Sequence, residues 1–150
     1  MLTHRSPNGS LMKPASVAIL LVILCCGCSS FNREWRQTPS TATDPMEGRW
    51  QGRWLSSSNG HTGALRCLIS KLDDETYQCR YRANYQWIFR FEYAVPLTVR
   101  ETDDSYHFTG QADLGALAGG IYKYEGTISG ETFRATYDSR YDRGVFEMSR

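Results

Sequence analysis

The chain has 150 residues, with 17 Lys and Arg against 16 Asp and Glu and a formal net charge of +1. Binding of nucleic acid depends on clustered Lys and Arg, so this near balance gives no general electrostatic reason for such binding. We therefore expect no nucleic-acid partner.

The first distinct element is a short apolar segment. It runs from Ala15 to Leu24 behind the lone positive charge of Lys13, and it ends at the cysteine-rich sequence CCGC, residues 25–28. Crossing a bilayer takes roughly 20 apolar residues, so this segment is too short to span one. A basic lead, a short apolar segment and small residues at its end are typical of a cleaved export signal.

This arrangement, over residues 12–28, resembles the signal peptide of a bacterial lipoprotein. Gly27 is the small residue that the family has before its lipidated cysteine. The resemblance therefore implies cleavage before Cys28 and lipidation of that residue. Cys25 and Cys26 remain alternatives for the lipidated position, and an uncleaved amphipathic anchor remains an alternative for the whole segment.

The same resemblance implies a place in the cell envelope, on the periplasmic or outer face, with the lipid as the anchor to a membrane. Residues 1–27 would be removed, whether translation starts at Met1 or at Met12. Since Arg5 and Lys13 leave with the signal peptide, 15 basic side chains remain against 16 acidic ones. The mature protein is then close to neutral.

Two regions follow the signal peptide. Residues 28–46 show no sustained period and are rich in Ser, Thr and Pro in their second half, which predicts a flexible tether. Trp35 is the residue that argues against this interpretation, and it lies either in the lipid interface or on the domain. Residues 47–150 are enough for one domain with a single core.

The clearest strand pattern is the segment from Trp87 to Val99. Every odd-numbered residue in it is apolar, and most even-numbered residues are polar. A period of two places the two sets on opposite faces of a strand. Pro96 cannot donate a ladder hydrogen bond, which predicts a bend, a bulge or a sheet edge at that position.

Similar alternation recurs along the rest of the domain and predicts eight or nine short strands with no amphipathic helix between them. Such a series is typical of an antiparallel meander. A sheet this long in so small a domain must close or fold over. We therefore predict an all-β fold, a barrel of eight to ten strands.

One hairpin can be assigned a register. A two-residue turn at Ser129-Gly130 is predicted, because Gly takes the positive φ that such a turn needs. Counting outward from this turn pairs Gly126 with Phe133, so that a large ring covers a strand glycine.

Cys67 and Cys79 are predicted to lie at matching positions of two neighbouring strands, and both belong to the apolar face. Exported proteins enter an oxidising compartment, where an even pair of cysteines is normally bonded. The sequence therefore predicts a structural disulfide, with two free thiols as the alternative. Neither a CxxC spacing nor a neighbouring His indicates a metal site.

The predicted inward face is rich in tyrosine, and by strand parity it contains no Asp, Glu, Lys, Arg or His. Buried hydroxyls need partners, so the tyrosines either end at the rims of the barrel or orient a guest in a cavity. General acid–base or covalent catalysis has no visible machinery, and we predict neither an enzyme nor a cofactor. The tyrosines are Tyr77, Tyr81, Tyr93, Tyr106, Tyr122, Tyr124 and Tyr137.

The predicted loops contain two features of interest. His61 lies in a polar loop that bears glycines, and His107 lies on an outward face, so both are predicted to be solvated. The loop Gly115–Gly120, GALAGG, is apolar where connections are usually polar. It is either a lid over a barrel mouth, a docking patch or a tightly packed turn.

Residues 48–50, Gly-Arg-Trp, resemble the Gly-x-Trp sequence on the first strand of lipocalins and their calycin relatives, although the C-terminal helix pattern of lipocalins is absent. The resemblance implies a barrel that carries a small apolar ligand. We predict a binding module for a small apolar or aromatic molecule, with Trp50, Trp54, Tyr122 and Tyr124 among its wall residues. The alternatives are that Trp50 plugs the base of the barrel, and that the protein is a structural or protein-interaction lipoprotein with a filled barrel.

Overall fold

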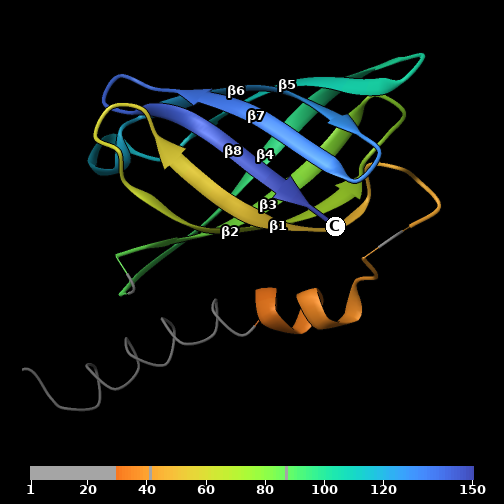
Figure 1. The fold of residues 1–150 in the computed structure, drawn as a ribbon, viewed down its shortest axis with the longest axis horizontal. Helices are drawn as coiled ribbons and strands as arrows, with labels where there is room; N and C mark the ends of the chain where they lie inside the picture. Colours follow the sequence, from red (N-terminus) through yellow and green to blue (C-terminus); the bar gives the residue numbers. More distant parts are fainter. Residues whose placement is uncertain (1–29, 41, 87) are drawn as a thin grey trace, which may run out of the picture. The chain divides into compact units, whose positions relative to one another are not determined.

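The computed structural model describes residues 30–40, 42–86 and 88–150 (Figure 1). It divides the chain into two units, Met1–Gln37 and Thr38–Arg150. The predicted signal peptide, residues 1–27, and the predicted lipidation site Cys28 lie outside the described residues. Within the described ranges, no helix has the length and apolar character needed to span a membrane.

In the first unit, residues 30–37 form a helix where the sequence predicted a tether without regular structure. The rings of Phe31 and Trp35, one helical turn apart, stack with their centroids 5.9 Å apart. Contacts between residues i and i+4 stabilise a helical turn. The Ser, Thr and Pro residues that suggested a tether are concentrated after Thr38, where the helix has already ended.

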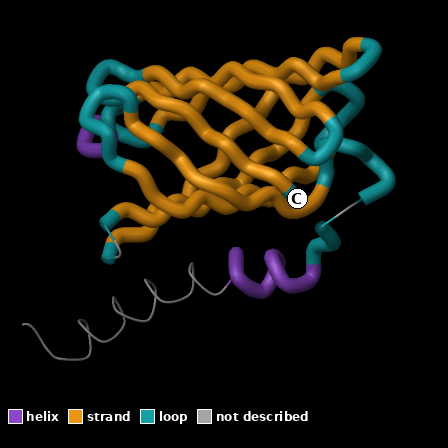
Figure 2. The backbone as a smooth tube through the Cα atoms, in the orientation of Figure 1, coloured by secondary structure: helices purple, strands orange, loops and turns teal. Residues whose placement is uncertain are grey.

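In the second unit, the described residues form eight antiparallel strands that close into a barrel (Figure 2). Each strand pairs with its neighbours in the sequence, and β8 pairs with β1 to complete the closure. This confirms the predicted all-β meander and barrel. The strands are β1 (Gly48–Ser56), β2 (Thr62–Lys71), β3 (Thr76–Tyr85), β4 (Phe89–Thr102), β5 (Ser105–Asp113), β6 (Ile121–Ser129), β7 (Thr132–Asp138) and β8 (Arg143–Ser149).

The predicted alternation is confirmed in β7 and in the middle of β4, whereas the odd-numbered Phe89 and Phe91 at the start of β4 are exposed. In β7, Phe133, Ala135 and Tyr137 are buried while the residues between them are exposed, as a period of two requires. All seven predicted inward tyrosines belong to the interior. Tyr77, Tyr81, Tyr124 and Tyr137 are part of the buried core, and Tyr93, Tyr106 and Tyr122 pack against it.

One end of the barrel is filled by side chains. The fully buried ring of Trp50 packs against Phe133, with centroids 6.0 Å apart, and its indole nitrogen donates a hydrogen bond of 3.0 Å to the backbone oxygen of Met46. The Arg150 guanidinium lies 4.3 Å from the centroid of the Trp50 ring. Met46 is itself completely buried. The barrel unit therefore starts before residue 47, the predicted boundary, because the segment ahead of β1 closes this end.

The start of β4 is a sheet edge. β4 pairs with β3 from Phe89 onward, whereas its pairing with β5 begins only at Leu97. Pro96 is the residue just before that point, so it lies where no β5 partner needs its missing N–H, in agreement with the predicted edge. Trp87, the first residue of the predicted strand, lies outside the described residues, and Gln86 takes a positive φ of 47° in the turn before β4.

The predicted register of the β6–β7 hairpin is wrong by two residues. Gly126 pairs with Ala135 rather than with Phe133, and the turn residues are Gly130 and Glu131. Gly130 has a φ of 54° at the first turn position, which is where a type II′ turn requires glycine. A shift of two residues keeps every side chain on its predicted face. The ring that covers Gly126 comes from Phe108 on β5, since a Cβ there would lie 2.6 Å from it.

Candidate functional site

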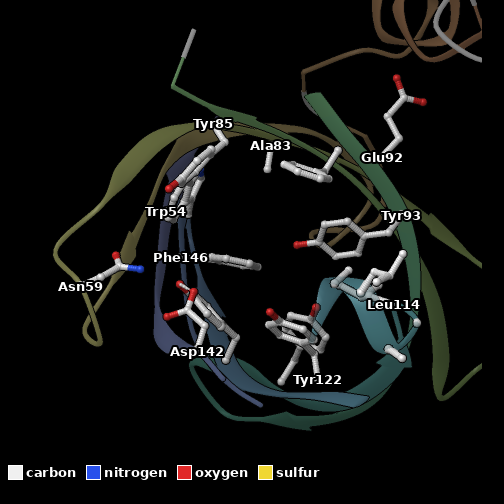
Figure 3. A pocket seen from close by; sticks show the side chains of 17 residues that line it. Trp54, Asn59, Ala83, Tyr85, Glu92, Tyr93, Leu114, Tyr122, Asp142 and Phe146 are labelled. Atoms are coloured by element: carbon white, nitrogen blue, oxygen red, sulfur yellow. Dashed lines mark hydrogen bonds between the residues drawn. The ribbon is translucent and has the colours of Figure 1, made fainter. Parts of the chain in front are cut away.

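The other end of the barrel contains a cavity of about 750 Å³ (Figure 3). Cavities that hold small molecules are typically roughly 300 to 1,000 Å³ and mostly apolar. The β1–β2, β5–β6 and β7–β8 loops contribute to the lining at this end, and the end of β3 and the start of β4 contribute strand residues. The principal aromatic wall residues are Trp54, Tyr85, Tyr93, Tyr122, Tyr137 and Phe146.

These rings support one another and form a continuous wall. Trp54 stacks on Tyr85 with centroids 5.8 Å apart, and its indole nitrogen donates to the backbone oxygen of Asn84 at 3.0 Å. Tyr137 packs on Phe146 at 5.0 Å. Because packed rings occupy fixed rotamers, the cavity has a preformed shape rather than one that a guest must create.

Tyr124 brings a polar atom without a partner to this apolar space. The residue lines the cavity and is only 3% exposed, and its buried hydroxyl has no hydrogen-bond partner among the described residues. The Tyr93 hydroxyl is close enough to act on the pKa of Tyr124 as a hydrogen-bonding group, but the pair does not reach hydrogen-bond geometry. Burial raises the pKa of Tyr124, so its proton stays in place as a donor. A buried hydroxyl left unpaired costs free energy, which a guest could recover.

Tyr81, deeper in the barrel, also has a buried hydroxyl without a partner in the described part of the chain. The remaining inward tyrosines with side-chain hydrogen bonds reach partners at the two ends of the barrel. The pairs are Tyr77 with Asp44 at 2.7 Å, Tyr106 with Glu101 at 3.0 Å, Tyr137 with Asp142 at 3.1 Å and Tyr85 with His61 at 2.7 Å. The rim alternative therefore holds for these tyrosines, whereas the orientation of a guest by Tyr81 or Tyr124 stays a prediction.

Asp142 is an acidic wall residue that the parity count missed. Its carboxylate accepts hydrogen bonds from the Ser56 hydroxyl at 2.6 Å and the Tyr137 hydroxyl at 3.1 Å. The residue lies in the β7–β8 loop, where strand parity does not apply, so the prediction of an uncharged interior holds for the strands and fails for this loop. The hydroxyl of Ser139, three residues earlier, accepts a hydrogen bond from the Asp142 backbone N–H. A serine followed three residues later by an aspartate is typical of such a turn, and it was the one sequence feature that could have drawn attention to Asp142.

Three of the four predicted wall residues, Trp54, Tyr122 and Tyr124, line the cavity. Trp50 does not line it and instead fills the closed end, so its assignment as a wall residue is corrected to the plug alternative. Parity could not separate Trp50 from Trp54, because both point inward and differ only in their depth along the barrel.

The GALAGG loop contributes to the mouth of the cavity. Leu114 and the 3-10 helix η1 (Ala116–Ala118) belong to the lining, while the side chain of Leu117 is also fully exposed to solvent. Gly119 has a φ of 105°, and a Cβ at this residue would lie 2.8 Å from the Tyr122 hydroxyl. The loop therefore packs on a wall tyrosine, which agrees with a lid position.

The two histidines of the predicted domain, His61 and His107, lie outside the lining. The Nδ1 atom of His61 is hydrogen-bonded to the Tyr85 hydroxyl, so His61 supports a wall residue from the rim rather than being merely solvated. His107 is exposed on β5 and lies 3.3 Å from the Ser105 hydroxyl.

The predicted disulfide is absent, because Cys67 and Cys79 are both buried free thiols. Cys67 is opposite Tyr81 and Cys79 is opposite Ile69, so the two cysteines are diagonal neighbours rather than direct partners across the ladder. The prediction assumed matching positions that the β2–β3 register does not provide. Burial raises the pKa of the Cys67 thiol well above its ordinary value.

We expect both thiols to resist alkylation in the native protein. Labelling needs the thiolate and access to it, and burial opposes both, so iodoacetamide should react at least about a hundredfold more slowly than with the unfolded chain. Intact mass after labelling with and without denaturant measures this. Rapid native labelling of either cysteine, or no labelling of either after unfolding without reductant, would contradict the buried dithiol.

Within the described ranges, no group of three or more His, Cys, Asp or Glu residues could hold a metal ion. The arrangement instead offers an apolar, aromatic space with a few hydroxyls and the carboxylate of Asp142. No protein-family model matches this chain, and neither does any curated protein or solved structure.

Proposed function

We propose that this protein is a binding module that holds a small, largely apolar or aromatic molecule in the open half of its barrel. The observation that carries the proposal is the cavity of about 750 Å³ with the unpartnered Tyr124 hydroxyl in its wall. Burying an apolar guest against these rings contributes roughly 25 cal/mol per Å². The Tyr124 hydroxyl would give such a guest one hydrogen bond and thus an orientation.

The alternative from the sequence, a filled barrel that acts through its surface, describes only the closed half around Trp50. The exposed Leu117 at the mouth favours an interaction surface, but it belongs to the loop that also lines the cavity. We therefore keep surface interaction as the second candidate.

We further propose that the module is held at a membrane of the cell envelope by a lipid on Cys28. The support is the resemblance of residues 12–28 to a lipoprotein signal peptide. A guest carried by a tethered barrel would then be captured or delivered near the membrane surface.

A cavity-filling variant tests binding. Ala83 lines the cavity, whereas Ala94 is exposed on the outer face of β4. We expect Ala83→Leu to weaken binding of the neutral probe Nile red at least about tenfold, because the added carbons occupy the space of the guest. The matched control Ala94→Leu should bind Nile red as the wild type does.

Nile red fluorescence titration measures this, and native mass spectrometry of protein purified from its own host asks whether a small molecule copurifies. If both variants bind Nile red as tightly as the wild type does, the probe occupies a site other than this cavity. If it does not bind the wild type at all, the binding proposal is wrong.

Removing the Tyr124 hydroxyl should leave the fold as stable as before or more stable, and it should weaken the binding of a guest that hydrogen-bonds to this hydroxyl. Tyr124→Phe deletes an unpaired buried hydroxyl, so the free energy of unfolding without ligand should stay constant or rise by up to about 1 kcal/mol. Retention of a copurifying guest should fall. The control Tyr77→Phe breaks the bond to Asp44 and should lower stability by about 1 kcal/mol. Chemical denaturation measures both, and a loss of stability in Tyr124→Phe would mean that its hydroxyl is already paired.

A further inference from the structure

We propose that the guest of this cavity carries a positive charge, as an amine or a quaternary ammonium group on an apolar body. This inference rests on the proposed binding function and adds to it the chemical class of the ligand. It follows from the charged side chains that line the cavity, from the absence of basic ones among the described lining residues, and from the aromatic rings next to the Asp142 carboxylate.

The lining contains no basic residue among the described positions, and it contains two acidic ones, Glu92 and Asp142. Glu92 does not contribute its charge to the interior. Its carboxylate points away from the cavity in Figure 3 and is ion-paired with the buried guanidinium of Arg82. Asp142 is then the one uncompensated charge that these lining residues supply.

The side chains that hydrogen-bond to the Asp142 carboxylate do not neutralise its negative charge. Its two side-chain donors, the hydroxyls of Ser56 and Tyr137, are neutral groups that orient the carboxylate without cancelling its charge. The nearby basic residues, Arg140 of the β7–β8 loop and Arg143 at the start of β8, have other contacts. The Arg140 guanidinium lies 5.4 Å from the Tyr141 ring centroid, and the Arg143 Nε lies 4.0 Å from the carboxylate of Asp138.

The wall next to this carboxylate is suited to a cation. Tyr137 donates its hydroxyl to Asp142, and its ring contacts Phe146 and Tyr122, with centroids 5.0 and 6.1 Å away. Tyr122 in turn stacks on Tyr124 at 6.4 Å. The faces of aromatic rings attract cations, and the attraction grows when the cation leaves water. The carboxylate and the ring faces therefore act on the same part of a guest.

The same features disfavour an anion such as a fatty-acid carboxylate. An anionic head would need a basic partner to offset its desolvation, and the described lining has none. It would also be repelled by Asp142 and by the electron-rich ring faces. A neutral guest would bind through apolar contact alone.

Three probes with the same ten-carbon chain separate these cases: decyltrimethylammonium, decanol and decanoate, each displacing Nile red from the full mature protein. We expect decyltrimethylammonium to bind about tenfold more tightly than decanol, and decanoate to bind more weakly than decanol. The preference for the cation should shrink as salt is added, because salt screens the attraction to Asp142.

A pair of variants assigns the charge preference to one residue. Asp142→Asn keeps the shape and removes the charge, but it keeps only one of the two acceptor oxygens. Either the Ser56 or the Tyr137 hydroxyl must then accept from the new amide NH₂ instead of donating. It should reduce the preference for decyltrimethylammonium over decanol severalfold and leave decanol binding unchanged. The control Asp138→Asn, at the exposed last residue of β7 and outside the lining, should keep the preference of the wild type. If Asp142→Asn does not fold, the salt dependence of the wild type decides.

The outcomes separate the two proposals. Equal binding of the cation and decanol, or tighter binding of decanoate, would overturn the cationic ligand and leave the binding module standing. A cation preference that persists in Asp142→Asn and at high salt would also overturn the assigned role of this carboxylate. Failure of Nile red and of all three probes to bind would overturn the binding function itself.

Discussion

Replacing Trp50 with alanine is expected to lower the free energy of unfolding by about 3 to 5 kcal/mol, the usual cost of removing a buried aromatic ring. The ring is fully buried, packs on Phe133 and donates to the backbone oxygen of Met46. Its removal leaves a void in the packed half of the barrel and also frees the segment ahead of β1 from its hydrogen bond. Chemical denaturation followed by circular dichroism measures the change.

A comparison with Trp54 tests whether the barrel has a packed half and an open half. Trp54 lines the open cavity, so Trp54→Ala should weaken Nile red binding, whereas Trp50→Ala should leave binding unchanged wherever the variant is still folded. Trp50→Phe keeps most of the apolar ring but loses the indole N–H, and it should cost less than the alanine variant. Loss of Nile red binding in folded Trp50→Ala at an unchanged cavity volume would contradict the division of the barrel into a packed and an open half.

The substitution Cys28→Ser is expected to abolish membrane association in the native host. Lipid attachment needs the thiol, and without it the mature protein has no acyl chains to partition into the bilayer. Stable anchoring takes more than one acyl chain, and bacterial lipoproteins, which the signal resembles, carry such modification. The variant should therefore be released from membranes or accumulate as the uncleaved precursor. Fractionation of host cells and mass spectrometry of the mature N-terminus measure this.

The neighbouring cysteines provide matched controls for this experiment. Cys26→Ser removes a thiol two residues away and should leave the protein with the membrane fraction, as should Cys25→Ser. Release by Cys26→Ser but not by Cys28→Ser would move the lipidated position to Cys26. A wild-type mature chain that is soluble and begins elsewhere would contradict the lipid anchor.

The sequence by itself determined the barrel class and the face of each strand residue. Both depend on a local property, the period of two, which is visible in the residues of β7 and in the odd positions of β4. This property is robust, since even the two-residue error in the register of Gly126 left every side chain on its predicted face. The inward tyrosines could be named for the same reason.

The register, the division of the barrel and the charge in its mouth were decided only by the tertiary structure. Gly130 could occupy either turn position, and the pairing of β6 with β7, which places Gly126 opposite Ala135, puts it at the first. The predicted disulfide between Cys67 and Cys79 was wrong for a similar reason, because the register of β2 and β3 makes the two residues diagonal neighbours rather than direct partners. Asp142 reaches the cavity from a loop, where no periodicity exists to be read.

Trp50 and Trp54 illustrate the physical reason. They lie on one strand with the same parity, yet one is packed by Met46, Phe133 and Arg150 while the other borders a cavity of about 750 Å³. Whether an inward ring meets neighbours or empty space depends on the summed volume of side chains from many strands at one depth of the barrel. The periodic pattern of one strand predicts whether a side chain points inward. The packing around that side chain depends on all the strands of the closed sheet.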